Sequence, residues 1–262
     1  MSETYSAVLA KNLNMVYETA QNSLHALKDI SLEVGQGEFL SLVGPSGCGK
    51  TTFLRMVANL ISPTSGTLLV NGKTPEQARL DRDYNYVFQE PALLPWRNAL
   101  RNVELPLLIN GVKRKEARQK AKEMLALVEL TKFEDHYPME LSGGMQQRVS
   151  IARALTTDPS MLLMDEPFGS LDLFTRDRMN LELLRIWGAA SRRTAIFVTH
   201  SIREAIFLSD SVAVLSPNPG RLLGVHRVKF PRPRQLNMRD SKEFREMNFA
   251  IEESIEKAIL QN

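Results

Sequence analysis

The fold of this chain is decided by the stretch Phe39-Leu40-Ser41-Leu42-Val43-Gly44-Pro45-Ser46-Gly47-Cys48-Gly49-Lys50-Thr51-Thr52. Its first five residues are nearly all apolar, which predicts a strand covered on both faces inside a parallel sheet. Residues 44–51 match the phosphate-binding pattern G-x-x-x-x-G-K-S/T, and residues 51–60 predict a helix. Because a strand, a glycine-rich turn and a helix follow one another in this order, we expect residues 44–52 to hold the phosphates of a nucleotide.

The residue types at this turn suit phosphate chemistry. Glycines let backbone N–H groups turn toward phosphate oxygens, and the N-terminal end of the next helix adds partial positive charge. We expect Lys50 to neutralise the β- and γ-phosphates and the hydroxyl of Thr51 to bind Mg²⁺. The alternative is a glycine-rich turn of purely structural use, but a chance match is rare in a chain of this length.

Two further short apolar runs end in polar residues. Met161–Met164 is followed by Asp165 and Glu166, and Ala195–Val198 is followed by Thr199-His200. With a similar run at 212–215, such strands separated by helical stretches predict a doubly wound α/β sheet, whose ligand site lies at the carboxyl ends of the strands. Asp165 could merely cap a helix. Beside a phosphate loop it is the expected second Mg²⁺ anchor, and Glu166 is placed to orient or deprotonate water.

Composition and charge narrow the classes of protein. The 262 residues are 43% hydrophobic and 24% charged, an ordinary globular composition. The apolar runs are far shorter than the about 18 residues needed to span a bilayer, so we expect no membrane-crossing segment, and we expect no secretory signal at the start. A net charge of +3 is too small to indicate nucleic-acid binding. The lone Cys48 allows no internal disulfide, which fits a reducing cytoplasm.

The chain divides into three expected parts. Residues 1–88 and 149–220 form the α/β core, residues 89–148 a mostly helical insert, and residues 221–262 a C-terminal extension. Four prolines between 217 and 233 predict an extended connector. The basic residues between 221 and 239 predict a solvated surface or a docking site for a partner or an anionic lipid surface. A final helix has one apolar face, which packs on its own domain or binds a partner; this face consists of Phe244, Met247, Ile251, Ile255 and Ile259.

Another motif precedes a helix in the second half of the chain. Residues 141–148 read Leu-Ser-Gly-Gly-Met-Gln-Gln-Arg. Ser142 followed by Gly143 and Gly144 predicts a helix N-cap with exposed N–H groups, which is a second anion-binding helix terminus.

Taken in order, these motifs resemble the ATP-binding subunit of ATP-binding cassette (ABC) transporters over about residues 5–220. The resemblance rests on the phosphate loop, Gln89, the 141–148 motif, Met161-Leu162-Leu163-Met164-Asp165-Glu166-Pro167, Gly169-Ser170-Leu171-Asp172 and His200. It implies a P-loop NTPase core with a mostly parallel sheet, an N-terminal antiparallel β portion and a helical insert. It also implies ATP and Mg²⁺ as ligands and ATP hydrolysis coupled to transmembrane transport.

The same resemblance implies a role for each motif. Two copies of the chain face each other head to tail, so that Ser142, Gly143 and Gly144 of one copy contact the γ-phosphate bound by the phosphate loop of the other. The remaining implied roles are as follows: Gln89 senses Mg²⁺ and the attacking water and links to the membrane subunit, Glu166 acts as base, His200 contacts the γ-phosphate, Asp172 couples the two sites, and Tyr17 stacks on adenine. The signature has Met145 where Gln is commonest, and Gly169-Ser170 replaces the usual Ser-Ala, but neither change removes a charged or metal-binding group.

Local features resemble one group of bacterial importers. Residues 89–97, 216–221 and 231–234 look like those of the nitrate, sulfonate and taurine importers, whose relatives carry thiamin pyrimidine precursors or bicarbonate. The resemblance implies two membrane-spanning permease subunits, indirectly a solute-binding protein, and a place on the cytoplasmic face of the bacterial inner membrane. Trp96 is either a core aromatic or helps to dock the permease.

Two other functions remain as alternatives. Soluble ABC ATPases that act on ribosomes or DNA usually carry two cassettes or a long coiled coil, whereas this chain has one phosphate loop and no sustained heptads. A catalytically idle cassette conflicts with the intact Lys50, Asp165, Glu166 and His200.

Cys48 at a helix N-terminus is expected to have a lowered thiol pKa. Alkylation of this thiol should then block ATPase activity, and bound ATP should protect it.

Overall fold

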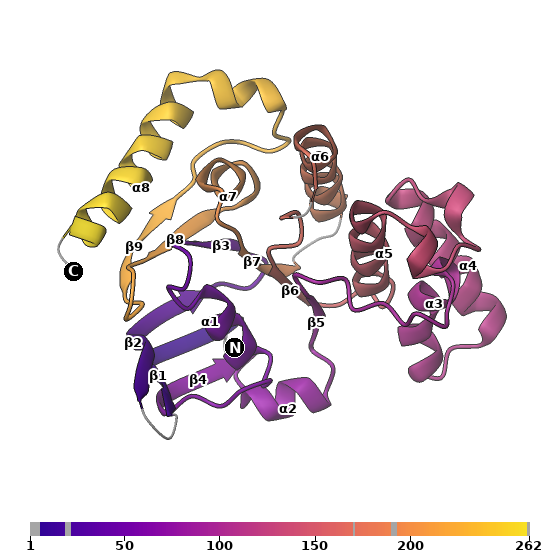
Figure 1. Ribbon diagram of the computed structural model, residues 1–262, viewed down its shortest axis with the longest axis horizontal. Coiled ribbons are helices and arrows are strands. Elements are labelled where there is room, and N and C mark those ends of the chain that lie inside the picture. Colours follow the sequence, from indigo (N-terminus) through magenta and orange to yellow (C-terminus); the bar gives the residue numbers. More distant parts are fainter. Residues whose placement is uncertain (1–5, 19–21, 170, 190–192, 261–262) are drawn as a thin grey trace, which may run out of the picture.

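The computed structural model describes residues 6–18, 22–169, 171–189 and 193–260. It has an antiparallel sheet, a larger and mostly parallel sheet covered by helices, and a helical lobe that projects to one side (Figure 1). The expected α/β core with its antiparallel portion and helical insert is therefore confirmed. Among the helices of these residues, none is both long and apolar enough to cross a bilayer.

Three strands form the antiparallel sheet in the order β2-β1-β4. They are β1 (Val8–Glu18), β2 (Ser23–Val34) and β4 (Ser65–Val70). Alternate residues at the end of β2, Ile30, Leu32 and Val34, are buried, because one face of this sheet packs on the core. The sheet covers α1 (Lys50–Val57), the helix that follows the glycine-rich turn.

Six strands of the described chain form the larger sheet in the order β5-β6-β7-β3-β8-β9. Their bounds are β5 (Tyr84–Val87), β6 (Met161–Asp165), β7 (Thr194–Val198), β3 (Phe39–Val43), β8 (Ser211–Leu215) and β9 (Leu222–Arg227). The neighbours from β5 to β8 are parallel, and β9 is antiparallel to β8. Every residue of β3, β6, β7 and β8 is buried, as their continuous apolar runs predict.

The core has two layers, one on each face of this sheet. One layer joins β3, β6 and β7 to α1 and the antiparallel sheet. The other joins them to α5 (Gly143–Leu155), α6 (Leu173–Ala189), α7 (Ile202–Leu208) and α8 (Lys242–Leu260). In this second layer the ring of Phe39 meets that of Trp187 edge to face at 4.9 Å between centroids.

The helical lobe consists of α3 (Ala99–Ile109), α4 (Arg114–Leu127) and α5, with short 3₁₀ turns at Thr131–Phe133 and Pro138–Glu140 (Figure 1). In α4 the residues Ala117, Ala121 and Leu125 are buried, as its helical spacing predicts. α5 runs from this lobe back to the core sheet, where it contacts β5. α5 therefore connects the lobe to the strand that precedes Gln89. A short helix, α2 (Pro75–Leu80), lies beside β4.

The proline-rich segment after residue 217 is not simply an extended connector. It contains β9, which pairs with β8 at the edge of the sheet. Gly220 also forms a bridge with Leu27 of β2. The prolines misled the prediction because they flank the strand, where a missing N–H costs no ladder hydrogen bond.

The basic segment is also not a uniformly solvated surface. Arg234 is only 5% exposed, and its Nη1 donates hydrogen bonds to three carbonyl oxygens at the end of α7, those of Ile206, Phe207 and Ser209. The last carbonyls of a helix lack partners within the helix. A guanidinium with five N–H donors satisfies several of them at once.

Two further arginines of this segment form ion pairs with the core of the chain. Arg232 binds the carboxylate of Asp210 at 2.7 Å, and Arg239 binds that of Asp177 on α6 at 2.5 Å. The guanidinium groups of these three arginines are paired with groups of the same chain, so they do not form a freely solvated surface.

The last helix, α8, packs on its own domain against α7 and β8. Phe244 and Ile251 are buried as expected. Ile259 is 50% exposed, so its assignment to the apolar face is wrong, and Ala258 takes that place. The angle of 100° between successive helical residues puts 258, seven after 251, back on the buried face.

Candidate functional site

The carboxyl ends of four adjacent parallel strands meet along one edge of the larger sheet. The glycine-rich turn follows β3, Asp165 ends β6, His200 follows β7 and Gln89 follows β5. The structure thus brings together residues that are far apart in the sequence. This edge is the candidate functional site.

The glycine-rich turn requires glycine at two positions. Gly44 has φ 155°, and a Cβ there would lie 2.7 Å from the carbonyl oxygen of Leu215. Gly49 has φ 92°, and a Cβ there would lie 2.5 Å from Leu27. α1 begins directly after Gly49 with no side chain bonded to its first N–H groups. The turn and helix therefore offer the backbone donors that an anion needs.

Lys50 folds over the inside of this turn. Its Nζ donates hydrogen bonds to the carbonyl oxygens of Gly44 at 2.9 Å and Pro45 at 3.0 Å. The residue is 6% exposed, and it takes part in none of the ion pairs between described residues. Its Nζ also lies 3.7 Å from the sulfur of Cys48. A buried ammonium group whose hydrogen-bond partners here are carbonyl oxygens and a thiol favours the approach of an anion.

A hydroxyl and a carboxylate meet next to Lys50. Oγ1 of Thr51 donates to Oδ1 of Asp165 at 2.8 Å, and the hydroxyl of Tyr86 donates to Oδ2 at 3.2 Å. Burial raises the pKa of Asp165, while the hydrogen bonds from Thr51 and Tyr86 oppose this rise. Burial and the Asp165 charge also raise the pKa of Tyr86, which stays a hydrogen-bond donor.

The oxygen pair fits Mg²⁺ chemistry. Mg²⁺ in nucleotide sites is held by one or two protein oxygens together with phosphate oxygens and water. Over the described ranges of the chain, groups of three or more His, Cys, Asp or Glu side chains suited to a metal are absent. The protein ligands of a cation here would therefore be few, as in a site completed by phosphates. Tyr86 was not predicted from the sequence; its place one residue from the end of a parallel strand is the only signal.

Glu166 and His200 face each other at the ends of β6 and β7. Nδ1 of His200 lies 3.2 Å from Oε2 of Glu166. Glu166 has φ 45°, and its N–H donates to the carbonyl oxygen of Val198, so β7 holds it in place. The imidazole is 57% exposed and the carboxylate side chain 21%. Both groups can therefore reach a ligand while remaining in contact.

Gln89 lies in an exposed segment, and side chains of the helical lobe fix this segment by hydrogen bonds to its backbone. Nε2 of Gln147, on α5, donates to the carbonyl oxygen of Phe88 at 3.1 Å. Arg153, also on α5, donates to the carbonyl oxygens of Pro91 and Ala92. The sequence placed these two α5 side chains in a helix but did not indicate their role as anchors of the 88–92 segment.

Tyr17 lies beside the start of α1. Its hydroxyl is 3.4 Å from Oγ1 of Thr52, and the residue is half-buried on β1. The aromatic ring is thus next to the phosphate-binding turn, at the side where the antiparallel sheet meets the core.

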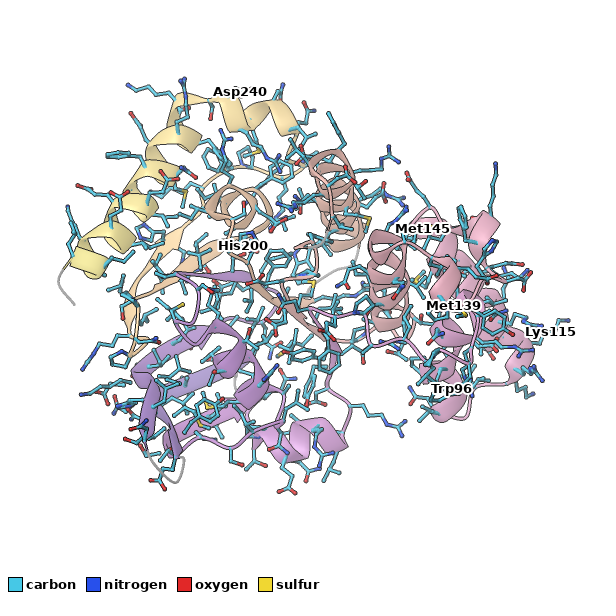
Figure 2. The ribbon with its side chains drawn as sticks, viewed as in Figure 1. Trp96, Lys115, Met139, Met145, His200 and Asp240 are labelled. Carbon is cyan, nitrogen blue, oxygen red and sulfur yellow. The ribbon has the colours of Figure 1, made fainter. Side chains whose placement is uncertain are left out.

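The Ser142–Gly144 segment does not join these residues within one chain. Oγ of Ser142 accepts a hydrogen bond from the N–H of Met145, which caps α5 as predicted. Met145 lies in the helical lobe, well apart from His200 (Figure 2). A Cβ at Gly143 would meet nothing within 4 Å, so this helix end is open to another molecule.

Asp172 begins α6 in a similar way. Its Oδ1 accepts a hydrogen bond from the N–H of Thr175 at 3.0 Å. Hydrogen bonding by the side chain and the N–H of Thr175 lowers the pKa of Asp172. Ser170, which belongs to the same expected motif, lies outside the described residues.

Cys48 corrects one prediction. The residue is 0% exposed, and burial raises the pKa of its thiol, against the opposing effect of Lys50. The lowered pKa expected at a helix N-terminus is wrong, because the loss of hydration outweighs the positive charge nearby.

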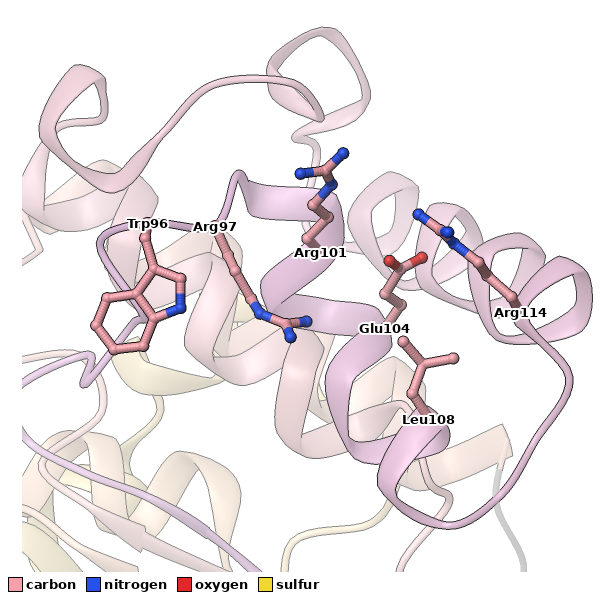
Figure 3. A pocket seen from close by; sticks show the side chains of 6 residues that line it. All are labelled: Trp96, Arg97, Arg101, Glu104, Leu108 and Arg114. Carbon is pink, nitrogen blue, oxygen red and sulfur yellow. The ribbon is translucent and has the colours of Figure 1, made fainter.

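A hollow on the helical lobe is lined by residues that follow Gln89 in the sequence (Figure 3). It has a volume of about 440 Å³ and is lined by Trp96, Arg97, Arg101, Glu104, Leu108 and Arg114. Trp96 is 68% exposed, so it is not a core aromatic. The Glu104 side chain is 2% exposed, and its Oε2 lies 3.7 Å from Nε of Arg118. The rim is therefore aromatic and positively charged.

Known proteins resemble this chain over most of its length. The family model described as "ABC transporter" matches residues 27–169. The "Taurine import ATP-binding protein TauB" of Burkholderia pseudomallei (strain 1710b) is 43% identical over 223 residues, which is 85% of each chain. The "Bicarbonate transport ATP-binding protein CmpD" of Synechocystis sp. is 40% identical over 95% of this chain and 89% of its own.

A solved structure also matches. The "dimeric structure of a post-hydrolysis state of the ATP-binding cassette MJ0796 bound to ADP and Pi" superposes with a TM-score of 0.78 at 34% identity. It covers 86% of this chain and all of that one.

Proposed function

Because this chain belongs to the ABC transporter family, as one of its ATP-hydrolysing cassettes, we propose that it is the ATPase subunit of a bacterial importer for a small solute. The observation that carries this proposal is the match of 85% of the chain to an ATP-binding protein of taurine import. We assign the solute to the nitrate, sulfonate or taurine class. Bicarbonate is the second candidate, since the bicarbonate-transport relative matches 95% of the chain.

ATP binds at the edge of the larger sheet in this proposal. The N–H groups of residues 44–52 surround the phosphates, and Lys50 turns its ammonium group from the carbonyls of Gly44 and Pro45 to the β- and γ-phosphates. Tyr17 stacks on adenine, because its ring stands beside Thr52 at the end of the phosphate chain.

The same geometry supports a role for Mg²⁺. Thr51, Asp165 and Gln89 would hold the ion, which when bound offsets phosphate charge and orients the β- and γ-phosphates. Thr51 and Asp165 already share a hydrogen bond, so both oxygens need only small rearrangements to become ligands.

Hydrolysis uses Glu166 and His200. Glu166 orients the attacking water and accepts its proton, and His200 contacts the γ-phosphate from the neighbouring strand end. Their mutual contact at 3.2 Å keeps both groups on the same side of the phosphate chain. With Nδ1 bound to Glu166, the Nε2 edge of the ring is free to turn toward the γ-phosphate.

A second copy of the chain completes the site. The open N-terminus of α5 at Ser142, Gly143 and Gly144 contacts the γ-phosphate held by the other copy, and Asp172 lies at the contact between copies. Within one chain this helix end is remote from His200, and the matched cassette MJ0796 is described as dimeric. Binding of ATP draws the copies together, and release of products lets them part.

The permease docks on the helical lobe next to Gln89. The exposed Trp96 and the arginine-rimmed hollow after it form an uncovered aromatic and basic surface. Two permease subunits, contacted by a solute-binding protein on the other side of the membrane, would place this chain at the cytoplasmic face of the inner membrane.

Reconstitution tests the proposed function. The chain is combined in proteoliposomes with its permease and solute-binding protein, and ATPase activity is measured with nitrate, taurine, an alkanesulfonate or bicarbonate. Stimulation by one of the first three supports the proposed class. Stimulation by bicarbonate alone selects the second candidate, and unchanged activity with a functional permease contradicts a role in import of these solutes.

A further inference from the structure

A buried carboxylate next to the candidate site has no part in the chemistry described so far. Glu204 lies in the first turn of α7 and is 5% exposed. Its Oε2 accepts a 2.6 Å hydrogen bond from Oγ1 of Thr199. A buried carboxylate loses its hydration and is tolerated only when nearby groups compensate. The groups that contact Glu204 therefore indicate which part of the structure it fixes.

Thr199 joins Glu204 to the loop that carries His200. The N–H of Thr199 donates to the carbonyl oxygen of Leu42 in β3, which fixes this residue to the sheet. Its Oγ1 also accepts a hydrogen bond from the N–H of Ser201 at 3.1 Å. The hydroxyl thus bonds to groups that follow His200, and it fixes the turn from β7 into α7. The direction of the His200 side chain depends on that turn.

Two side chains of α6 act on Glu204 from a second direction. Arg176 and Asn180 are one helical turn apart, so they share a face of α6. Burial raises the pKa of Glu204, and the hydrogen bond from Thr199, the charge of Arg176 and the amide of Asn180 oppose this rise. Nη2 of Arg176 donates to the carbonyl oxygen of Leu171 at 2.9 Å, directly before Asp172. The cluster therefore extends from the His200 loop to the start of α6.

This cluster is incompletely paired. In the part of the chain that the structure describes, Oε1 of Glu204, Nε of Arg176 and both amide atoms of Asn180 are enclosed without a hydrogen-bond partner. Enclosed polar atoms without partners are unfavourable, so these three side chains compensate one another only in part.

We propose that Glu204 is a positioning residue that directs His200 toward the γ-phosphate through Thr199, and that Arg176 and Asn180 tie this loop to segment 171–172. The inference rests on the proposed role of His200. Since segment 171–172 lies at the proposed contact between copies, the cluster connects that contact to the His200 loop. ATP binding itself does not require the cluster.

The test compares matched variants of the full chain. Glu204→Gln removes the charge, and Thr199→Val removes the hydroxyl while keeping the side-chain shape. We expect kcat to fall about tenfold in each, which corresponds to one weakened contact in the transition state. The dissociation constant for ATP stays within about twofold, because no ATP-binding residue is changed. Thr199→Ser keeps the hydroxyl and recovers most of kcat.

Two controls separate positioning from a general loss of structure. Glu252→Gln makes the same chemical change at an exposed position of α8 and leaves kcat unaltered. The ring signals of His200, identified by NMR from their loss in His200→Ala, shift in Glu204→Gln and Thr199→Val but not in Glu252→Gln. Thermal unfolding of each variant shows whether lost activity follows lost stability.

Three outcomes overturn the proposal. One is wild-type kcat in both Glu204→Gln and Thr199→Val while His200→Ala is impaired, which leaves the proposed function standing. Another is a loss of kcat with unchanged His200 signals, which makes Glu204 merely structural. The third is wild-type kcat in His200→Ala, which removes the proposed role of His200 and with it this inference.

Discussion

Oγ1 of Thr51 and Oδ1 of Asp165 share a 2.8 Å hydrogen bond although 114 residues separate them in the sequence. Thr51 lies in the first turn of α1, and Asp165 ends β6, with β7 between β6 and β3 in the sheet. Parallel strands with aligned carboxyl ends make this contact possible. A hydroxyl and a carboxylate are thereby placed beside Lys50 as a pair of hard oxygen ligands.

Removal of the Thr51 hydroxyl should weaken nucleotide binding only when Mg²⁺ is present. For Thr51→Val we expect the affinity for Mg-ATP to fall about tenfold, or ~1.4 kcal/mol, because one oxygen ligand is lost. Affinity for ATP in EDTA changes much less. Titration of a fluorescent ATP analogue under both conditions measures this difference. Thr51→Ser, which keeps the hydroxyl, is the control; equal losses with and without Mg²⁺ would contradict the assignment.

The thiol of Cys48 should react slowly in the folded protein. The residue is fully buried and burial raises the pKa of its thiol, so both access and the thiolate fraction are low. We expect labelling by a thiol reagent at pH 7.5 to be at least about tenfold slower than in denaturant. Absorbance during reaction with a disulfide reagent follows the rate. Rapid complete labelling of the folded chain, prevented by ATP, would instead restore the expectation drawn from the sequence.

Arg234 should contribute to stability rather than to membrane attachment. Arg234→Ala leaves three carbonyl oxygens at the end of α7 without their donor. We expect the free energy of unfolding to fall by about 2–4 kcal/mol, as for other buried polar networks. Urea unfolding provides the measurement, and Arg221→Ala, whose side chain is 50% exposed, should change it by less than about 0.5 kcal/mol. Arg234→Ala with wild-type stability and lost binding to anionic vesicles is the opposite result.

Much of the fold follows from the sequence because its signals are local. Short, mostly apolar runs at β3, β6, β7 and β8 each end in a turn or polar residue, and parallel pairing then brings those ends together. The phosphate loop is equally local. These features predict where Lys50, Asp165 and His200 lie without any knowledge of long-range contacts.

The remaining features depend on contacts between distant segments. The bonds from Arg234 to the end of α7 appear only after the tail folds back over that helix. The thiol of Cys48 is buried because its turn packs against Gly220 and the antiparallel sheet. Tyr86 and Gln147 act through single hydrogen bonds to Asp165 and Phe88. Neither composition nor periodicity carries information on such contacts.

Trp96 should matter for assembly and not for folding. Its side chain is 68% exposed, so Trp96→Ala removes little buried area and should change the free energy of unfolding by less than about 0.5 kcal/mol. Co-purification with the permease should fall sharply, since exposed aromatics dominate interface energies. Trp187→Ala is the matched control, because Trp187 is buried against Phe39 and its loss costs about 3–5 kcal/mol. Undiminished permease binding by Trp96→Ala would move the docking surface elsewhere.

The central claim is that two copies of this chain enclose ATP between the phosphate loop of one and the Ser142–Gly144 segment of the other. Glu166→Gln keeps the size of the side chain but removes the base, so it should bind ATP without hydrolysing it. The most direct test is the mass of Glu166→Gln by light scattering, with and without Mg-ATP, beside the ATPase rate of the unmodified chain. The account predicts a monomer that becomes a dimer only with Mg-ATP, and measurable hydrolysis by the unmodified chain. A protein that binds Mg-ATP yet remains monomeric at every concentration tested would contradict it.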